Sequence, residues 1–599
     1  MVMATGVALS RRGIRAGRAE MHLFMKRACD LRRIVSAALF LLALPLFVAG
    51  QNSSPSASGA DQKSIPTIFK SQATLVEVPA VVTGKDGKHI YGLSKTDFRV
   101  LENGNEQKIA FFEEVNASHN RLPVSNNPPN VFTNLSANTA DRHAVTVVLL
   151  DEINTPYLDQ VYGRGQLIKY LAENLNSQQT VALMLLNSKG VTRVANFTED
   201  ASVVISALKK VSSELPAGVG PSLEEPVLAS MRPGIVTGSG QFRSPQNESE
   251  RALREFLVAG DVVDARFGRE RPIEDTMQAF LSIAWSLSGI PGRKSLIWAT
   301  GSFPFYIDSP SFRPPDPRLA ALYERAMEAL NDAQISVYPV DVRGLVASET
   351  GDTNWARVRR PALGGLAYSA ESMAQTQQRL STTATMETFA SMTGGRAFFN
   401  SNDLTSGFRR AAEDSESYYV LGYYLNSQDT RPGWRKLRVK LDRQHAEVRA
   451  REGFFVGTTT MNAEDAHQAD VNFALTSPFE STGIPMLVRW NPATLQMKDG
   501  KKSEFAIVLP AASVVQESAE NQFDLEIVWE TDREGAPAQR DGKTMKGAAD
   551  AKSLVRVKQE GVIFKNFVQL PAGEYRVRFV VRNNLNGRIG SVTTPLTVD

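Results

Sequence analysis

The sequence predicts an α/β protein with a doubly wound, mainly parallel sheet of Rossmann-like type, flanked by β-rich, sandwich-like domains at both ends. The first observation is an unbroken apolar and β-branched run from Val145 to Leu150, which is typical of a strand buried on both faces. The second is the alternation of further buried runs with segments of helical spacing. The third is period-two alternation near both ends of the chain.

At 599 residues the chain is too long for a single core. Its composition is that of a globular protein, with 42% hydrophobic and 22% charged residues. Changes in composition and periodicity divide it into a signal peptide (1–50), a linker (51–65), a small β domain (66–117), a linker (118–142), an α/β domain (143–430) with insertions near 216–269 and 345–381, a β extension (431–458), a linker (459–469) and a C-terminal sandwich-like domain (470–599).

The first 50 residues have the build of a secretory signal peptide. Basic residues end at Arg33, and about sixteen apolar residues follow before Gly50. That run is short for a membrane span, which needs roughly twenty residues. An N-terminal membrane anchor is the alternative, and translation can also start at Met21 or Met25. We expect an exported protein, periplasmic or extracellular, without a transmembrane helix in the mature chain.

Charge and cysteine content exclude several classes once this leader is removed. Residues 1–50 hold eight of the 67 basic residues and two of the 64 acidic ones, so 59 bases and 62 acids remain and the net charge changes from +3 to about −3. Nucleic-acid binding then loses its main support. The single cysteine, Cys29, lies in the leader, so the mature chain has no disulfide, thiolate metal site or cysteine nucleophile.

The elements follow in order along the chain. In the small β domain, Asn103-Gly104 is a strong hairpin signal and Gly87 suits a left-handed turn position. In the α/β domain, buried strands are expected at 180–187, 295–299 and 335–344, an edge strand at 191–198, and helices at 158–176, 199–211, 273–287, 319–333, 382–392 and 404–413. The C-terminal domain contains four strongly alternating runs, SEFAIVLP, FDLEIVWE, VIFKNFVQLP and EYRVRFVVRN.

Several segments resemble the von Willebrand factor A (VWA)-related domain proteins found among exported proteins of bacteria such as the Acidobacteria. The resemblance covers about residues 66–599, and its closest segments are GLSKTDFRVLENGNEQKI, LLDEINTPYLDQVYGRGQLIKYL, GIPGRKSLIWATGSFPF, SVYPVDVRGL and TGGRAFFNSNDL. It implies an A-type α/β fold. It implies no particular activity, because the family is defined by its domain.

The resemblance also implies a metal-ion-dependent adhesion site on three loops at one edge of the sheet. Its motif is Asp-x-Ser-x-Ser on the first loop, Thr on the second and Asp on the third, which suits a hard divalent cation. Here Asp151 matches the first Asp, Thr155 the last hydroxyl and Thr276 the second-loop Thr. Ile153 replaces the middle Ser and Thr300 stands where Asp is expected. The sequence therefore predicts a degenerate site with weak affinity for Mg²⁺, Mn²⁺ or Ca²⁺.

Structural roles are an alternative interpretation of the predicted metal ligands. Asp151 and Thr155 can instead cap the helix that follows them, and Thr276 follows an acidic first turn that the helix dipole explains equally well. Asp341 also ends a strand, and we expect it to be tied to Arg343 rather than to be catalytic. No histidine spacing indicates a zinc site or a catalytic triad.

Three functions remain. The first is a non-enzymatic, adhesion-type binding protein that docks a protein or cell-surface ligand at the carboxyl-end edge of the sheet. The second is a structural or assembly factor of the cell envelope, with the α/β domain as scaffold and the β flanks as binding parts. The third, a hydrolase, lacks a recognisable nucleophile–base pair.

Overall fold

The protein is described from a computed structural model. The structure describes residues 75–116, 128–134, 144–174, 180–212, 235–236, 242–243, 270–301, 316–344, 382–425, 432–456, 463–491, 495–497, 500–515, 521–548 and 550–598. All of these belong to one compact unit, Lys70–Asp599. The predicted signal peptide, with Cys29, and the insertion 345–381 lie outside the described residues. So does insertion 216–269, apart from the paired strands β9 (Ile235–Val236) and β10 (Phe242–Arg243).

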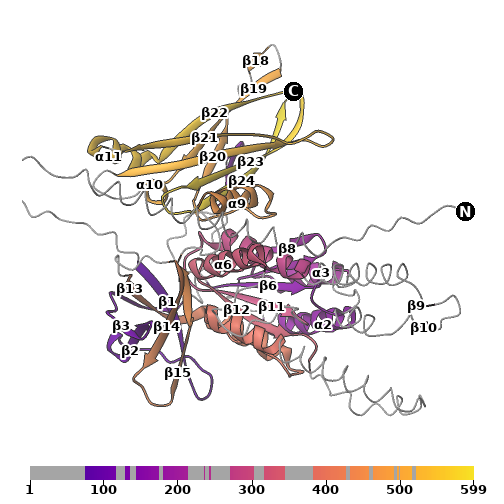
Figure 1. Ribbon diagram of the computed structural model, residues 1–599, viewed down its shortest axis with the longest axis vertical. Helices are drawn as coiled ribbons and strands as arrows, with labels where there is room; N and C mark the ends of the chain where they lie inside the picture. The colour runs from indigo at the N-terminus through magenta and orange to yellow at the C-terminus, as the bar shows by residue number, and fades with distance from the viewer. Residues whose placement is uncertain are drawn as a thin grey trace, which may run out of the picture. The chain divides into compact units, whose positions relative to one another are not determined.

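A mixed five-stranded sheet forms the centre of the α/β domain (Figure 1). Its strands, in spatial order, are β12 (Ile335–Asp341), β11 (Lys294–Thr300), β6 (Val145–Asp151), β7 (Thr180–Asn187) and β8 (Gly190–Thr198). The first four run parallel, and β8 is an antiparallel edge strand, as predicted for 191–198. Because β6 and β11 are parallel neighbours, the loops after Asp151 and Thr300 leave the sheet at the same edge.

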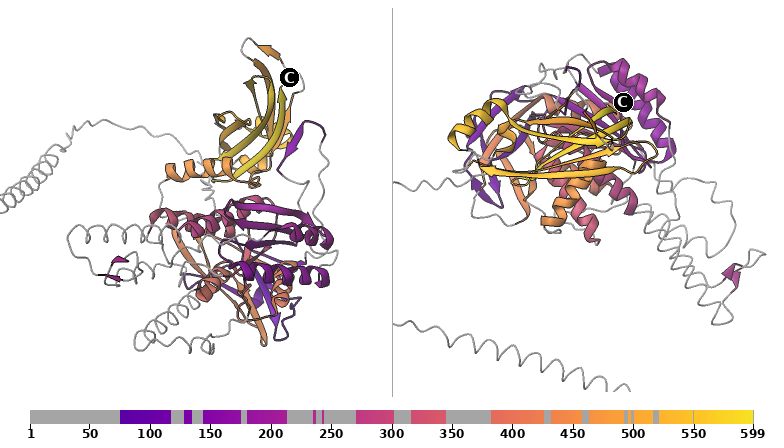
Figure 2. Two further views of the ribbon diagram at one scale, coloured as in Figure 1. Left: turned by 90° about the vertical axis from the view of Figure 1, so that its right-hand side faces the viewer. Right: turned by 90° about the horizontal axis from the view of Figure 1, so that it is seen from above.

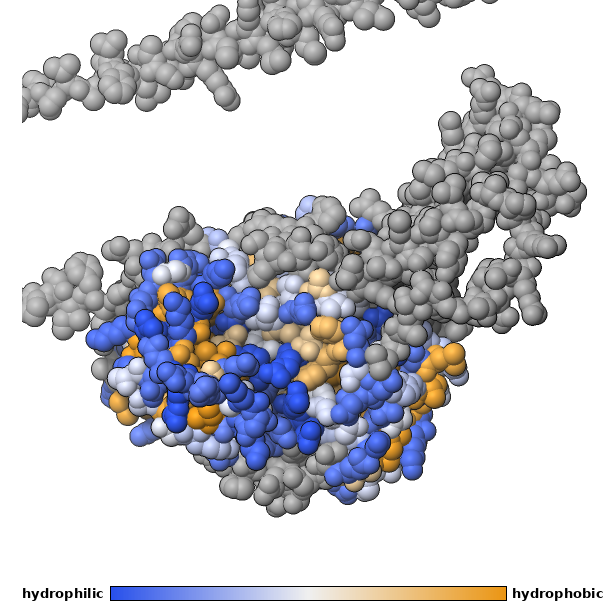
Figure 3. All heavy atoms as spheres, turned by 90° about the horizontal axis from the view of Figure 1, so that it is seen from below, coloured by the Kyte–Doolittle hydropathy of each residue, from blue (hydrophilic) through white to orange (hydrophobic). Residues whose placement is uncertain are grey.

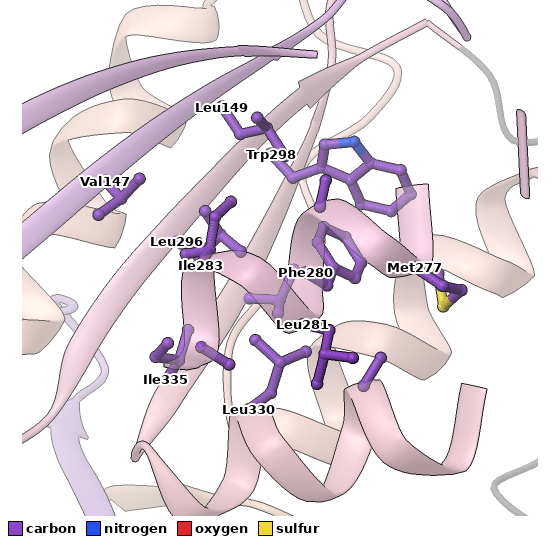
Figure 4. Packing of buried hydrophobic residues seen from close by; sticks show 14 of the residues in the cluster. Val147, Leu149, Met277, Phe280, Leu281, Ile283, Leu296, Trp298, Leu330 and Ile335 are labelled. Carbon is purple, nitrogen blue, oxygen red and sulfur yellow. The ribbon is translucent and has the colours of Figure 1, made fainter. Parts of the chain in front are cut away.

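Helices pack on both faces of this sheet (Figure 1 and Figure 2). On one face, Val147 and Trp298 pack with Phe280 of a helix over residues 270–287; the rings of Phe280 and Trp298 are 5.2 Å apart and nearly perpendicular (Figure 4). On the other face, Val148 and Tyr338 join a separate cluster. The helices are α2 (Tyr157–Asn174), α3 (Ala201–Lys210), α6 (Pro317–Asp332), α8 (Leu404–Glu416) and a helix over 382–393. Each of the four parallel strands therefore buries both sets of its alternating side chains, whereas the edge strand β8 is partly exposed.

A second body consists of two four-stranded sheets, with orders β15-β1-β13-β4 and β16-β14-β2-β3. Its strand β13 lies within the range 143–430 predicted for the α/β domain, but it pairs antiparallel with β1 and β4. Asn103 (φ 48°) and Gly104 (φ 88°) make the predicted two-residue turn between β2 and β3. Segments 66–117 and 431–458 thus share sheets. The strands are β1 (Leu75–Gly84), β2 (Phe98–Glu102), β3 (Asn105–Gln107), β4 (Phe111–Asn116), β13 (Ser417–Tyr424), β14 (Gly433–Leu441), β15 (Ala446–Ala450) and β16 (Gly453–Val456), with a short 3₁₀ turn at Lys95–Asp97.

The C-terminal region has two further sheets around a core that includes Trp490, Phe505 and Trp529. Its elements are α9 (Ala463–Thr476), β17 (Leu487–Trp490), β18 (Leu495–Met497), β19 (Gly500–Leu509), α10 (Ala511–Val514), β20 (Gln522–Asp532), β21 (Gln539–Ala548), α11 (Ala551–Glu560), β22 (Val562–Leu570), β23 (Gly573–Asn583) and β24 (Ile589–Val598). Val131–Thr133 were predicted to lie in a linker, but these residues form β5 and pair with β17. In the part of the chain that the structure describes, no helix has the length and apolar character needed to cross a membrane.

Candidate functional site

The predicted ligand positions come together at the edge of the sheet where β6 and β11 end. Asp151 is the last residue of β6 and only 2% exposed. Its Oδ2 accepts hydrogen bonds from Asn154 Nδ2 (2.8 Å) and from the indole Nε1 of Trp298 (2.8 Å), and its Oδ1 accepts one from the Asn154 amide (3.1 Å). The Thr300 side chain makes a further hydrogen bond to this carboxylate. The chain itself thus surrounds Asp151 with donors.

Asn154 joins this carboxylate to the helix over 270–287. Besides its bond to Asp151, Asn154 Nδ2 donates to Thr276 Oγ1 at 2.9 Å. Thr276, which is fully buried, donates in turn to the carbonyl of Pro272 at 2.7 Å. The amide NH₂ group therefore bridges the two side chains that the adhesion-site motif would connect through a cation.

Thr155 connects the first loop to the third. Its Oγ1 accepts a hydrogen bond from the Gly301 amide (2.8 Å), and Gln160 of α2 donates to the main-chain carbonyl of Thr155 (2.9 Å). The loops approach so closely that a Cβ at position 301 would lie 2.9 Å from Cδ of Pro156. A side chain at position 301 would therefore clash with the first loop, and the hydrogen bond to Thr155 joins the two loops.

Burial dominates the electrostatics of Asp151. Removal from water disfavours the carboxylate and raises its pKa to about 6, although the hydrogen bonds from Asn154, Trp298 and Thr300 act in the opposite direction. A divalent cation binds the ionised carboxylate, so below about pH 6 it would have to displace a proton from Asp151. Without a bound cation, the Asp151 carboxyl therefore holds its proton to a higher pH than a free aspartate does.

As arranged, these residues do not fit a divalent cation. Asp151 supplies the only carboxylate among the four positions Asp151, Thr155, Thr276 and Thr300, and protein donors already bond to its oxygens. A hollow of about 20 Å³, room for about one water molecule, adjoins Asp151 and Thr155, but Thr276 and Thr300 do not line it. Nowhere among the described residues do three or more His, Cys, Asp or Glu side chains group as metal ligands. Metal binding by Asp151, Thr155 and Thr276 stays a prediction of the sequence.

Two features of this edge were not predicted. The first is Trp298, whose indole reaches Asp151 across the sheet from the neighbouring strand. The second is a set of exposed apolar side chains on the first two turns of α2, directly after the Asp151 loop. They are Tyr157 (47% exposed), Leu158 (79%), Val161 (49%) and Tyr162 (36%). By contrast, Asp341 forms the expected pair with Arg343, at 2.8 Å from Nη2.

Comparisons with known proteins give little further guidance. No protein-family model matches the chain, and no curated protein matches it. Among solved structures, it is similar to the VWA domain of SpRpn10, with 12% sequence identity, covering 33% of this chain and 73% of that one at a TM-score of 0.15. A likeness of this size carries no argument about function.

Proposed function

We propose that this chain is a non-enzymatic binding protein that docks a protein partner at the carboxyl-end edge of the α/β sheet. The docking surface consists of Tyr157, Leu158, Val161 and Tyr162, hereafter the α2 patch. A doubly wound, VWA-like domain and export from the cytoplasm belong to the same proposal. In it, no metal ion bridges the partners, and Asp151 acts as an internal support for the loop that presents α2.

The observation that carries this proposal is the exposure of the α2 patch beside a rigidly bonded loop. Residues 157 and 161, like 158 and 162, are four apart and lie on the same side of a helix. Aromatic and aliphatic side chains dominate the energetics of protein interfaces. Figure 3 shows one face of the molecule, on which apolar patches are separated by a mainly hydrophilic surface.

The loop below the patch supports it. Asp151, Asn154 and Thr155 hold the turn through side-chain hydrogen bonds, and Gln160 ties α2 back to the main chain of that turn. A partner that binds the patch therefore meets side chains on a fixed backbone, which lowers the entropic cost of association.

The test compares two exposed apolar positions. The full mature chain, immobilised, is presented with the exported proteins of its source, and retained proteins are identified by mass spectrometry and re-tested after purification. We expect Leu158→Asp to lower the affinity of a purified partner at least about tenfold, the effect of one good apolar anchor. Val203→Asp makes the same change at a 48% exposed position on α3 and serves as the matched control.

Two further experiments distinguish this proposal from metal-dependent docking and from the envelope-scaffold function. Adding a chelator leaves binding unchanged if no metal takes part. Phe567→Asp changes a 42% exposed side chain on β22 of the C-terminal region. A purified partner lost with Phe567→Asp but retained with Leu158→Asp would contradict docking on α2 and support the envelope-scaffold function.

A further inference from the structure

A hollow of about 460 Å³ lies away from the Asp151 network. Its walls are the helix over 382–393, the segment 395–399, and the facing strands β14 and β15 with the two residues that follow β15. Four arginines line it, Arg396, Arg438, Arg449 and Arg451. We infer that this hollow binds the oxyanion, carboxylate or phosphate, of a small organic molecule. The inference is independent of docking on α2.

The arginines and the glutamates that line this hollow differ in burial. Arg451 is 9% exposed and Arg449 and Arg396 are partly buried, whereas the two lining glutamates, Glu387 and Glu452, are exposed. Water screens the exposed carboxylates strongly and the buried guanidinium groups much less. Asp332 and Glu77 offset part of the charge of Arg451, so the positive excess lies mainly at Arg396 and Arg449.

Buried hydrogen-bond donors remain unused there. Arg449 Nη2 donates to Asp414 (2.6 Å), and Arg451 donates to the carbonyls of Asn331 (3.2 Å) and Glu77 (2.9 Å). The Nε atoms of both arginines are shielded from solvent and meet no acceptor among the described residues. A buried donor without an acceptor is costly. Because both Nε atoms are closed to water, an oxyanion in the hollow can accept from them only after these side chains turn toward it.

The layer behind the hollow does not neutralise it. Arg293 Nη2 donates to Tyr338 Oη (2.8 Å), and Tyr338 Oη donates to Asp414 (2.7 Å), the same carboxylate that Arg449 contacts. Asp414 thus accepts from Arg449 directly and is linked to Arg293 through Tyr338, whereas Arg396 interacts with it only at longer range. Burial and, next, the charge of Arg449 lower the pKa of Arg396. Arginine stays charged under such conditions, so the positive excess persists.

A purely structural account explains part of this arrangement. Arg449 and Arg451 tie β15 to the α/β domain through Asp414 and main-chain carbonyls. Arg396 makes no hydrogen bond or ion pair with another described residue, and none of its nitrogens is among the buried unpaired atoms, so its guanidinium is open to water and to a ligand. An oxyanion bound between Arg396 and Arg449 would explain why both guanidinium groups line the hollow.

The volume and the remaining walls indicate the ligand class. Small-molecule sites in proteins span about 300–1,000 Å³ and combine apolar walls with a few polar groups. Here the apolar walls include Phe399, Leu437 and Val448. The planar guanidinium fork matches carboxylate and phosphate oxygens. The expected ligand therefore carries an oxyanion on an apolar body.

Phenylphosphate is a suitable probe, titrated into the full chain at constant ionic strength and followed by ³¹P line broadening. We expect saturable broadening for the wild type and for Arg443→Gln, which removes the same charge at an exposed position that does not line the hollow. Arg396→Gln should weaken binding about tenfold, as expected for one lost charge-assisted hydrogen bond. Arg396→Lys, which keeps the charge, should weaken binding less.

Benzoate, followed by its own proton line widths, is the second arm, and benzyl alcohol is the neutral control. Binding of phenylphosphate alone identifies a phosphate site, and binding of benzoate alone identifies a carboxylate site. Circular dichroism confirms that the variants are folded. The inference is overturned if neither anion binds, if benzyl alcohol binds equally well, or if folded Arg396→Gln retains wild-type affinity.

Discussion

The Asp151 network and the arginine-lined hollow are both buried charged sites, yet they are completed in opposite ways. Asp151 is a buried acid whose oxygens accept bonds from Asn154, Trp298 and Thr300. Arg449 and Arg451 are buried bases that keep donors without acceptors among the described residues. A site whose polar groups bond to one another has little left for a ligand, whereas unused buried donors favour one. On this contrast we expect ligand binding at the hollow with unused donors rather than at the internally bonded Asp151 site.

Asp151→Ala should give the largest effect on stability. It leaves Trp298 Nε1 buried without an acceptor and removes one of the two acceptors of Asn154 Nδ2, which we expect to lower the free energy of unfolding by roughly 3 kcal/mol. Urea unfolding followed by tryptophan fluorescence measures it. Asp403→Ala removes an exposed helix cap and should cost about 1 kcal/mol. Equal losses in the two variants would contradict an internally bonded Asp151.

The pH dependence of stability should show Asp151 directly. Its pKa is about 6 in the folded state against 3.8 for the free group, so between those values the folded protein binds more protons than the unfolded one. The contribution of this group therefore falls as pH rises from about 4 to about 6, by about 3 kcal/mol in all. Urea unfolding of the wild type and of Asp151→Asn across this range should diverge by that amount. Parallel curves would show that burial does not raise this pKa.

Asn154→Asp tests whether the amide takes the place of a cation. The change sets a second carboxylate against Asp151 and removes the donor to Thr276, so we expect a loss of about 2 kcal/mol at neutral pH. Mg²⁺ should restore part of that stability in the variant and leave the wild type unchanged. Restoration in both proteins, or in neither, would contradict the substitution of amide for metal.

The sequence predicted the parts of this site that depend on strand order. Parallel β6 and β11 bring Asp151 and Thr300 to one edge, and a buried apolar run is enough to find such strands. The bond from Trp298 to Asp151 was not predictable, because it depends on how an indole packs across two strands. Nor was the bridge from Asn154 to Thr276, which lies 122 residues further along the chain.

The arginine-lined hollow was beyond sequence analysis for a different reason. Its walls come from segments assigned to separate parts, the helix over 382–393 in the α/β domain and β14 and β15 in the β extension. β5 shows the same limit, since three residues of a predicted linker pair with a distant strand. Periodicity in the sequence predicts individual helices and strands. Which of them lie next to one another depends on tertiary packing.

A Mn²⁺ titration of the wild-type chain, followed by water-proton relaxation, tests the central claim most directly. If Asn154 completes the Asp151 site, the wild type shows no saturable Mn²⁺ binding at concentrations up to about 1 mM, the weak end of natural divalent-cation sites. Saturable binding below that concentration that disappears in folded Asp151→Asn would contradict the claim. It would instead restore the metal site that the motif predicts.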